Sequence, residues 1–81
     1  MNIFEKLQDF QSQPLSLICF NMVKWFEYDS VDISIKERQN VESGVWISVK
    51  IVKLGKTCRV DGQQIDIVKF RLIKFLNKNI N

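Results

Sequence analysis

The most regular alternation of apolar and polar positions lies in residues 45–54, VWISVKIVKL. Successive side chains of a strand point to opposite faces, so alternate residues of this segment share a face. One face is wholly apolar, and the other is mixed, as expected for a strand with neighbours on both sides. The sequence therefore predicts a central strand. Its apolar face is formed by Val45, Ile47, Val49 and Ile51, and its mixed face by Trp46, Ser48, Lys50 and Val52.

The segments on either side of this strand supply two neighbours. Residues 31–36 alternate between apolar and polar side chains, which predicts a strand with Val31, Ile33 and Ile35 on its half-buried face. A polar loop that ends at Gly44 connects this strand to residues 45–54, as in an antiparallel hairpin. A tight turn at residues 55–56 and a short strand at residues 57–60 complete the prediction of a three-stranded antiparallel meander.

Helical spacing marks the N-terminal part of the chain. Apolar side chains recur every three or four positions in residues 2–11, which predicts a short amphipathic helix. Pro14 ends that helix and suits the first turn of a second one. Residues 15–21 also fit the alternating pattern of a strand, so a strand in this segment is the alternative. The second helix is predicted to bury one stripe, made of Leu15, Ile18, Cys19, Met22, Val23 and Phe26.

A further helix is predicted near the C-terminal end. Asp61-Gly62 fits either a two-residue hairpin turn or a helix cap, and we favour a helix that begins by about Gln64. The fold class is therefore α+β: two N-terminal helices, a three-stranded antiparallel meander and a C-terminal amphipathic helix. The apolar face of the last helix consists of Ile65, Val68, Leu72, Phe75 and Leu76.

The size of the chain limits it to one small domain, residues 1–81, because 81 residues with one proline and three glycines contain no linker. A core this small is only just sufficient, so oligomerisation would stabilise it. Cys19 and Cys58 are expected to be reduced, buried packing residues. The first residues lack the pattern of a signal peptide, and the longest apolar run falls short of the ~20 residues that span a bilayer, so we expect a cytoplasmic protein.

Some apolar side chains lie off the predicted core faces of the helices. They are either buried by other elements or form a surface for a protein partner, because exposed aromatic and aliphatic clusters tend to mark protein contacts. The candidate protein-binding residues are Leu17, Phe20 and Tyr28 on the opposite side of the second helix, and Ile67 and Phe70 in the C-terminal helix.

Charge is distributed unevenly along the chain. Residues 1–44 hold seven acidic and four basic side chains, whereas residues 45–81 hold two acidic and eight basic ones. The basic half is either a solvated face or a surface that attracts nucleic acid, an acidic protein or an anionic membrane, and the membrane is ranked last of these. Lysine outnumbers arginine nine to three, which disfavours specific recognition of phosphate or guanine. The candidate nucleic-acid-binding residues are Lys50, Arg59, Lys69, Arg71, Lys74 and Lys78.

The sequence offers no recognisable catalytic site. It contains no histidine, so no Ser-His or Cys-His pair and no histidine-containing zinc site exists, and two cysteines cannot form a four-cysteine site. No glycine-rich phosphate loop occurs. We therefore expect a protein that is not an enzyme and that needs neither metal nor cofactor.

The composition, rich in isoleucine, lysine and asparagine and lacking alanine, points to an AT-rich coding source. In size and composition the chain resembles small accessory or inhibitor proteins of bacteriophages and mobile elements. That resemblance implies stoichiometric action on a phage or host protein, for example in lysis regulation or anti-defence. The predicted function is a small protein-binding regulator or inhibitor, with a protein partner, self-association or both. The alternative is a basic nucleic-acid-binding module.

Overall fold

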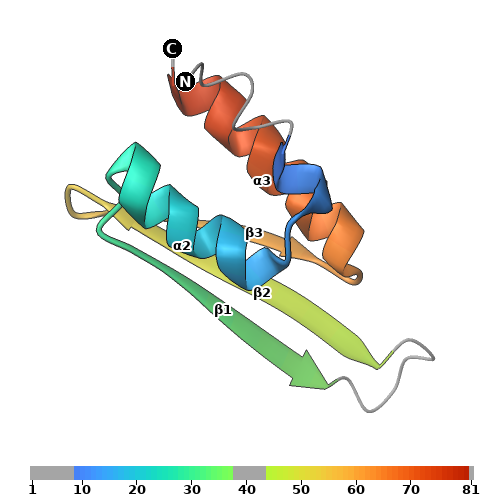
Figure 1. Ribbon diagram of the computed structural model, residues 1–81. Coiled ribbons are helices and arrows are strands. Elements are labelled where there is room, and N and C mark those ends of the chain that lie inside the picture. The colour runs from blue at the N-terminus through green and yellow to red at the C-terminus, as the bar shows by residue number, and fades with distance from the viewer. Residues whose placement is uncertain (1–8, 38–43, 81) are drawn as a thin grey trace.

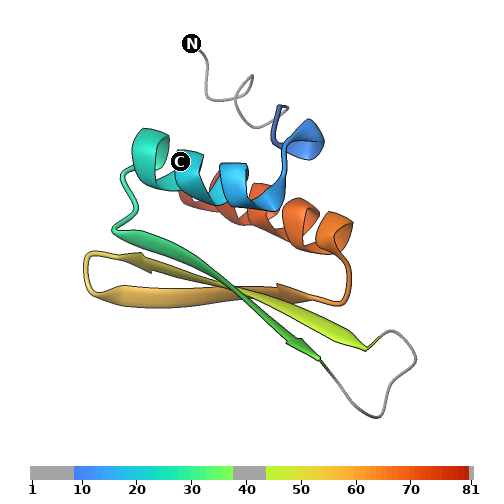
Figure 2. The same ribbon diagram turned by 60° about the horizontal axis from the view of Figure 1, so that its bottom comes forward.

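A computed structural model describes residues 9–37 and 44–80. Helices and a three-stranded sheet form two layers, with both α-helices on the same face of the sheet (Figures 1 and 2). The class is α+β. In chain order the elements are the 3-10 helix η1 (Phe10–Ser12), α2 (Leu15–Phe26), β1 (Ser30–Glu37), β2 (Val45–Lys53), β3 (Lys56–Gly62) and α3 (Ile65–Ile80).

The order of the helices differs from the predicted one. Leaving out the 3-10 helix η1, the described elements run one α-helix, three strands and one α-helix, instead of two α-helices before the sheet. Most of the predicted helix over residues 2–11 lies outside the described residues, and its last part forms η1. Gln13 is extended, at φ −92° and ψ 150°, because the ring of Pro14 disfavours helical backbone in the preceding residue. Pro14 then starts α2, where its carbonyl accepts hydrogen bonds from Leu17 and Ile18.

The sheet has the order β1-β2-β3 with both pairs antiparallel, which confirms the meander and the central position of residues 45–53. Val49 lies between Ile33 and Val60 in the register. The turn after β2 is displaced by one residue from the prediction and consists of Leu54 and Gly55. Both have positive φ, 52° and 78°, which matches the twist of a two-residue hairpin.

The core lies between the sheet and the two α-helices. Residues 15–21 belong to α2, so the alternative of a strand there is wrong. Phe10 is fully buried, with its ring stacked 6.3 Å from Trp25 and edge-on to Phe26, which ties η1 to α2. The buried side chains are Phe10, Leu15, Ile18, Cys19, Met22 and Tyr28, then Ile47, Val49, Ile51 and Val60 from the sheet, and Val68, Leu72 and Leu76 from α3.

Gly62 explains how closely α3 approaches the sheet. It ends β3, so Asp61-Gly62 is not a hairpin turn, and α3 begins three residues later at Ile65. A Cβ atom on Gly62 would lie 2.9 Å from Cγ2 of Val68, closer than such atoms normally approach. The absence of a side chain therefore lets the first turn of α3 pack directly on β3.

Candidate functional site

The predicted protein-binding residues fall into two groups on different helices. Leu17 and Phe20 of α2 are 42% and 61% exposed, and Ile67 and Phe70 of α3 are 37% and 55% exposed. α2 packs against β1, whereas α3 packs against β3 and β2. The structure therefore places the two groups over opposite edges of the sheet and does not join them into one surface.

Tyr28 does not share the surface of Leu17 and Phe20. α2 ends at Phe26, and Glu27 adopts a left-handed conformation with φ 58° that turns the chain away from the helix axis. Tyr28 is consequently 8% exposed, and its ring centroid lies 6.1 Å from that of Phe75. Its prediction as a surface residue is corrected, because the continuous helix on which that prediction rested stops two residues earlier.

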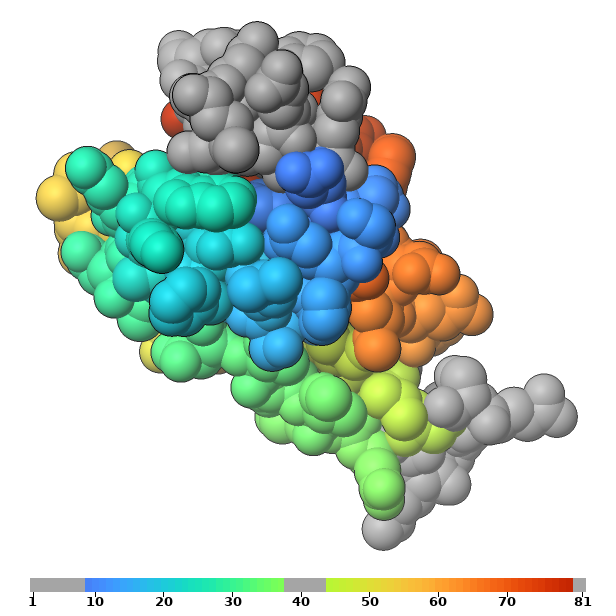
Figure 3. Space-filling model, in the orientation of Figure 1, coloured from blue at the N-terminus to red at the C-terminus, as the bar shows by residue number. Residues whose placement is uncertain are grey.

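The α2 group belongs to a larger apolar area that includes strand β1. We call this area the edge surface; it consists of Leu17, Phe20, Val23, Ile33 and Ile35, which are between 36% and 64% exposed. A groove of about 460 Å³ runs between α2 and β1, where their atoms lie side by side in Figure 3. The groove is lined by Ser16, Cys19, Phe20 and Val23 of α2 and by Ser30, Val31, Asp32 and Ile33 of β1.

The exposure of β1 was not anticipated from its alternating sequence. The register puts Ile35 beside Ile47, so both face the helix layer, yet Ile35 is 64% exposed and Ile47 only 3%. The reason is coverage: the second half of β1 extends beyond α2 (Figure 1). Val23, predicted in the core stripe, is 40% exposed for a related reason, because it points toward the groove at the sheet edge.

β1 is also an edge strand. Within the described part of the chain it pairs with β2 alone, so the hydrogen-bonding groups of its other side face away from the sheet. An unpaired strand edge is a ready template for another strand. The edge surface therefore combines exposed apolar side chains with a backbone that can accept a partner strand.

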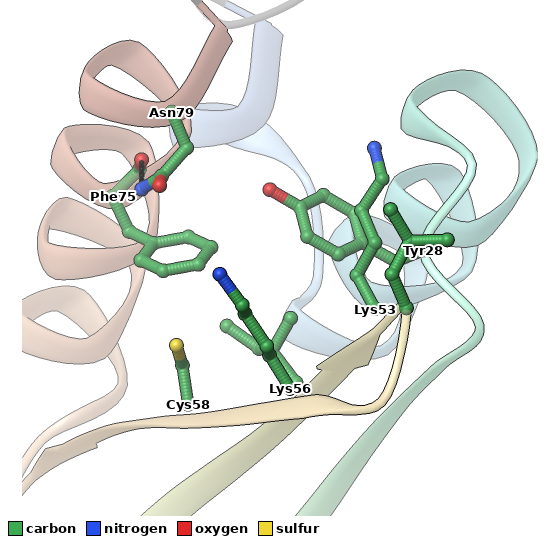
Figure 4. A pocket seen from close by; sticks show the side chains of 8 residues that line it. Tyr28, Lys53, Lys56, Cys58, Phe75 and Asn79 are labelled. Carbon is green, nitrogen blue, oxygen red and sulfur yellow. Dashed lines mark hydrogen bonds between the residues drawn. The ribbon is translucent and has the colours of Figure 1, made fainter.

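A separate cavity of about 280 Å³ lies beside the β2-β3 turn (Figure 4). Nζ of Lys53 donates a hydrogen bond to the carbonyl of Phe26 at 3.0 Å and lies 4.9 Å from the centroid of the Tyr28 ring. Nδ2 of Asn79 donates to the carbonyl of Phe75 at 2.7 Å. These hydrogen bonds stabilise the fold. The lining residues are Tyr28, Ile51, Lys53, Leu54, Lys56, Cys58, Phe75 and Asn79.

Tyr28, in this cavity, and Cys19, in the core, have raised pKa values. Burial raises the pKa of Tyr28, and the nearby Cys58 raises it further, so the phenol keeps its proton at neutral pH. Cys58 is exposed, which corrects the expectation that both cysteines are buried. Cys19 is buried as predicted, and burial, with a smaller effect of Asp32, raises its pKa to about 11.

The six candidate nucleic-acid-binding residues do not form one site. Lys50 and Arg59 are neighbours across β2 and β3, on the sheet face opposite the buried Val49 and Val60. Lys69, Arg71, Lys74 and Lys78 all belong to α3, which lies on the other face. Some of these groups have local roles, since Arg71 donates to the carbonyl of Asp61 and Nζ of Lys74 lies 5.5 Å from the Phe70 ring centroid.

Three further observations concern partners and relatives. Among residues 9–37 and 44–80, no three histidine, cysteine, aspartate or glutamate side chains gather as a metal site would require. In the same part of the chain, no helix has the length and apolar character needed to cross a membrane. Comparison of the chain with protein-family models, curated proteins and solved structures found no match.

Proposed function

We propose that this chain is a protein-binding domain that recognises another polypeptide through the edge surface. One observation carries the proposal: five apolar side chains of α2 and β1 are 36% to 64% exposed, and one edge of β1 pairs with no strand of the described residues. Exposed apolar areas of this kind mark interaction sites in soluble proteins. The site offers exposed apolar area and backbone groups that can form hydrogen bonds, and both support binding more directly than catalysis.

The arrangement suits recognition of an extended strand. A strand added to β1 would form main-chain hydrogen bonds, and its inward-facing side chains would enter the groove beside Phe20. Phe20 is the natural anchor, because it is the largest exposed side chain of the edge surface and aromatic residues dominate binding energies. Stoichiometric action as a regulator or inhibitor is part of this proposal. The resemblance to phage and mobile-element accessory proteins makes a phage or host protein the first partner to test.

Replacing Phe20 with aspartate should abolish capture of a protein partner. The change removes the anchor and places a charge on a surface that would be desolvated, so we expect at least about tenfold weaker binding. Tagged protein would be used to capture partners from a lysate of its native host, followed by titration of each purified partner. Far-ultraviolet circular dichroism would verify that the variant is folded.

Phe70→Asp is the matched control, because Phe70 is similarly exposed but lies on α3. It should leave binding unchanged. Binding lost in Phe70→Asp but retained in Phe20→Asp would move the contact to α3 and contradict the proposal. Equal binding by both variants would show that neither apolar group takes part.

Nucleic-acid binding is expected to be weak and to disappear near physiological salt, because the basic residues are divided between two faces of the fold. The measurement is a titration of labelled duplex and single strand from low salt to ~0.15 M, where screening over about 8 Å is effective. Charge reversal of Lys69, Arg71 and Lys74 to glutamate is the comparison. Tight binding that falls steeply with salt and is lost on charge reversal would contradict the protein-binding proposal and favour the nucleic-acid-binding alternative.

A further inference from the structure

The exposed edge strand β1 has a self-complementary sequence. Ser34 lies at its middle, with Asp32 two residues before and Lys36 two residues after on the same face. Ile33 and Ile35 occupy the adjacent positions on the opposite face, the one covered in part by α2. Read in the reverse direction, the strand therefore presents an isoleucine opposite an isoleucine and a lysine opposite an aspartate.

The charges select one register for antiparallel pairing of two such strands. A pair centred on Ile33 also keeps apolar residues together, but it sets Asp32 opposite Ser34 and leaves the lysine without a carboxylate. A pair centred on Ser34 sets Asp32 opposite the partner's Lys36 and Lys36 opposite the partner's Asp32. Opposite charges directly across an antiparallel pair are favourable, and like charges are unfavourable. The register centred on Ser34 therefore pairs every Asp32 with a Lys36 and every Ile33 with an Ile35, and it sets Val31 opposite Glu37 only at the ends of the paired segment.

We propose that the occupant of the edge surface is a second copy of this chain, paired antiparallel through β1 about a two-fold axis at Ser34. The proposal rests on the proposed function and names its partner. The two sheets would join into one of six strands, three from each copy. Such an interface is isologous, so the same residues are buried on both sides.

The α2 side chains fit this arrangement. Phe20 and Ile33 line the groove between α2 and β1, and Ile35 lies beyond it. In the register centred on Ser34, Ile35 of each copy lies opposite Ile33 of the other copy, so the exposed Ile35 is set beside the partner's groove. Burial of Ile35 there would also enlarge the small core that a chain of 81 residues can form.

Charge order distinguishes a second copy from an unrelated strand. Any extended apolar segment can satisfy the backbone of β1, but a lysine on an exposed edge strand normally discourages pairing. Here the carboxylate of Asp32 lies at the same distance from Ser34 as Lys36, in the opposite direction. Asp32 already lies opposite Lys50 within the sheet, and a partner with the reversed order of charges sets a second opposite charge beside it as well as one beside Lys36. The chain itself is such a partner.

The test is the molar mass of the purified full-length chain by light scattering and sedimentation, from about 1 µM to 1 mM. A monomer has a mass of 9.6 kDa, and we expect the dimer, twice that value, to predominate at the upper end. Asp32→Lys and Lys36→Asp should each be monomeric, because each sets like charges opposite one another twice. Lys56→Asp, the same change on the other edge strand, should remain dimeric.

The decisive experiment is to mix Asp32→Lys with Lys36→Asp. One strand then carries two lysines and the other two aspartates, so every charged pair is complementary again, and a 1:1 mixture should recover the dimer mass. A wild-type chain that stays monomeric at 1 mM would overturn the proposal, as would a dimer that both single variants retain or a mixture that remains monomeric. A monomeric wild type whose Phe20→Asp variant loses a captured partner would leave the proposed function intact.

Discussion

Replacing Val49 with aspartate is expected to leave the chain unfolded. Val49 is completely buried at the centre of β2, with β1 on one side and β3 on the other. An unpaired carboxylate there costs several kcal/mol, which is comparable with the total stability of about 5–15 kcal/mol for a small domain. Circular dichroism and a thermal melt would measure the loss of secondary structure and of the cooperative transition.

Lys50→Asp is the control, because it puts the same carboxylate on the next residue of β2, where the side chain is exposed on the other face. That variant should fold. A soluble Val49→Asp protein with a cooperative melt would contradict the position of Val49 in the core.

The second large effect is expected for Leu72→Ala. Leu72 is fully buried on the face of α3 that covers β2 and β3. Truncation removes apolar contacts and leaves a cavity, which lowers the free energy of unfolding by about 2–5 kcal/mol. For a domain of this size, we expect a drop in melting temperature of at least about 8 °C.

The matched variant is Ile65→Ala on the same helix. Ile65 is 49% exposed, and alanine has the higher helix propensity, so its truncation should change stability little. Urea denaturation of both variants would give the two free energies of unfolding. Similar values for Leu72→Ala and the unchanged chain would mean that α3 is not held by this face.

The alternation of apolar and polar residues was sufficient to predict β2. Both edges of β2 pair with other strands of the chain, and helices of the chain cover its apolar face. The same reasoning identified β1 and the face of Ile33 and Ile35, but it could not show whether a helix lies over them. Coverage depends on where α2 ends and how it crosses the sheet, which no local pattern specifies. The edge surface therefore became visible only in three dimensions, although Leu17 and Phe20 were already suspected.

Tyr28 shows a different limit of sequence reasoning. Helical periodicity continues past Phe26, and the stop occurs because Glu27 takes a left-handed conformation. Glycine and asparagine are the usual residues at that position, so glutamate gave no signal. The long-range hydrogen bond from the amide of Leu54 to Oδ2 of Asp29, 2.8 Å long, fixes the loop that follows. It joins residues 25 positions apart and has no sequence signature.

The contact between η1 and α3 has a consequence for synthesis of the chain. The three strands pair in sequence order and can form as soon as each emerges, because neighbouring pairs close short loops. The helix layer over β2 and β3, by contrast, is supplied by α3, which is translated after every other described element and packs back onto the first of them. A nascent chain therefore exposes the part of the apolar sheet face that α3 covers, over β2 and β3, until α3 has left the ribosome. Folding of this domain is completed after translation of its core strands, rather than progressively along the chain.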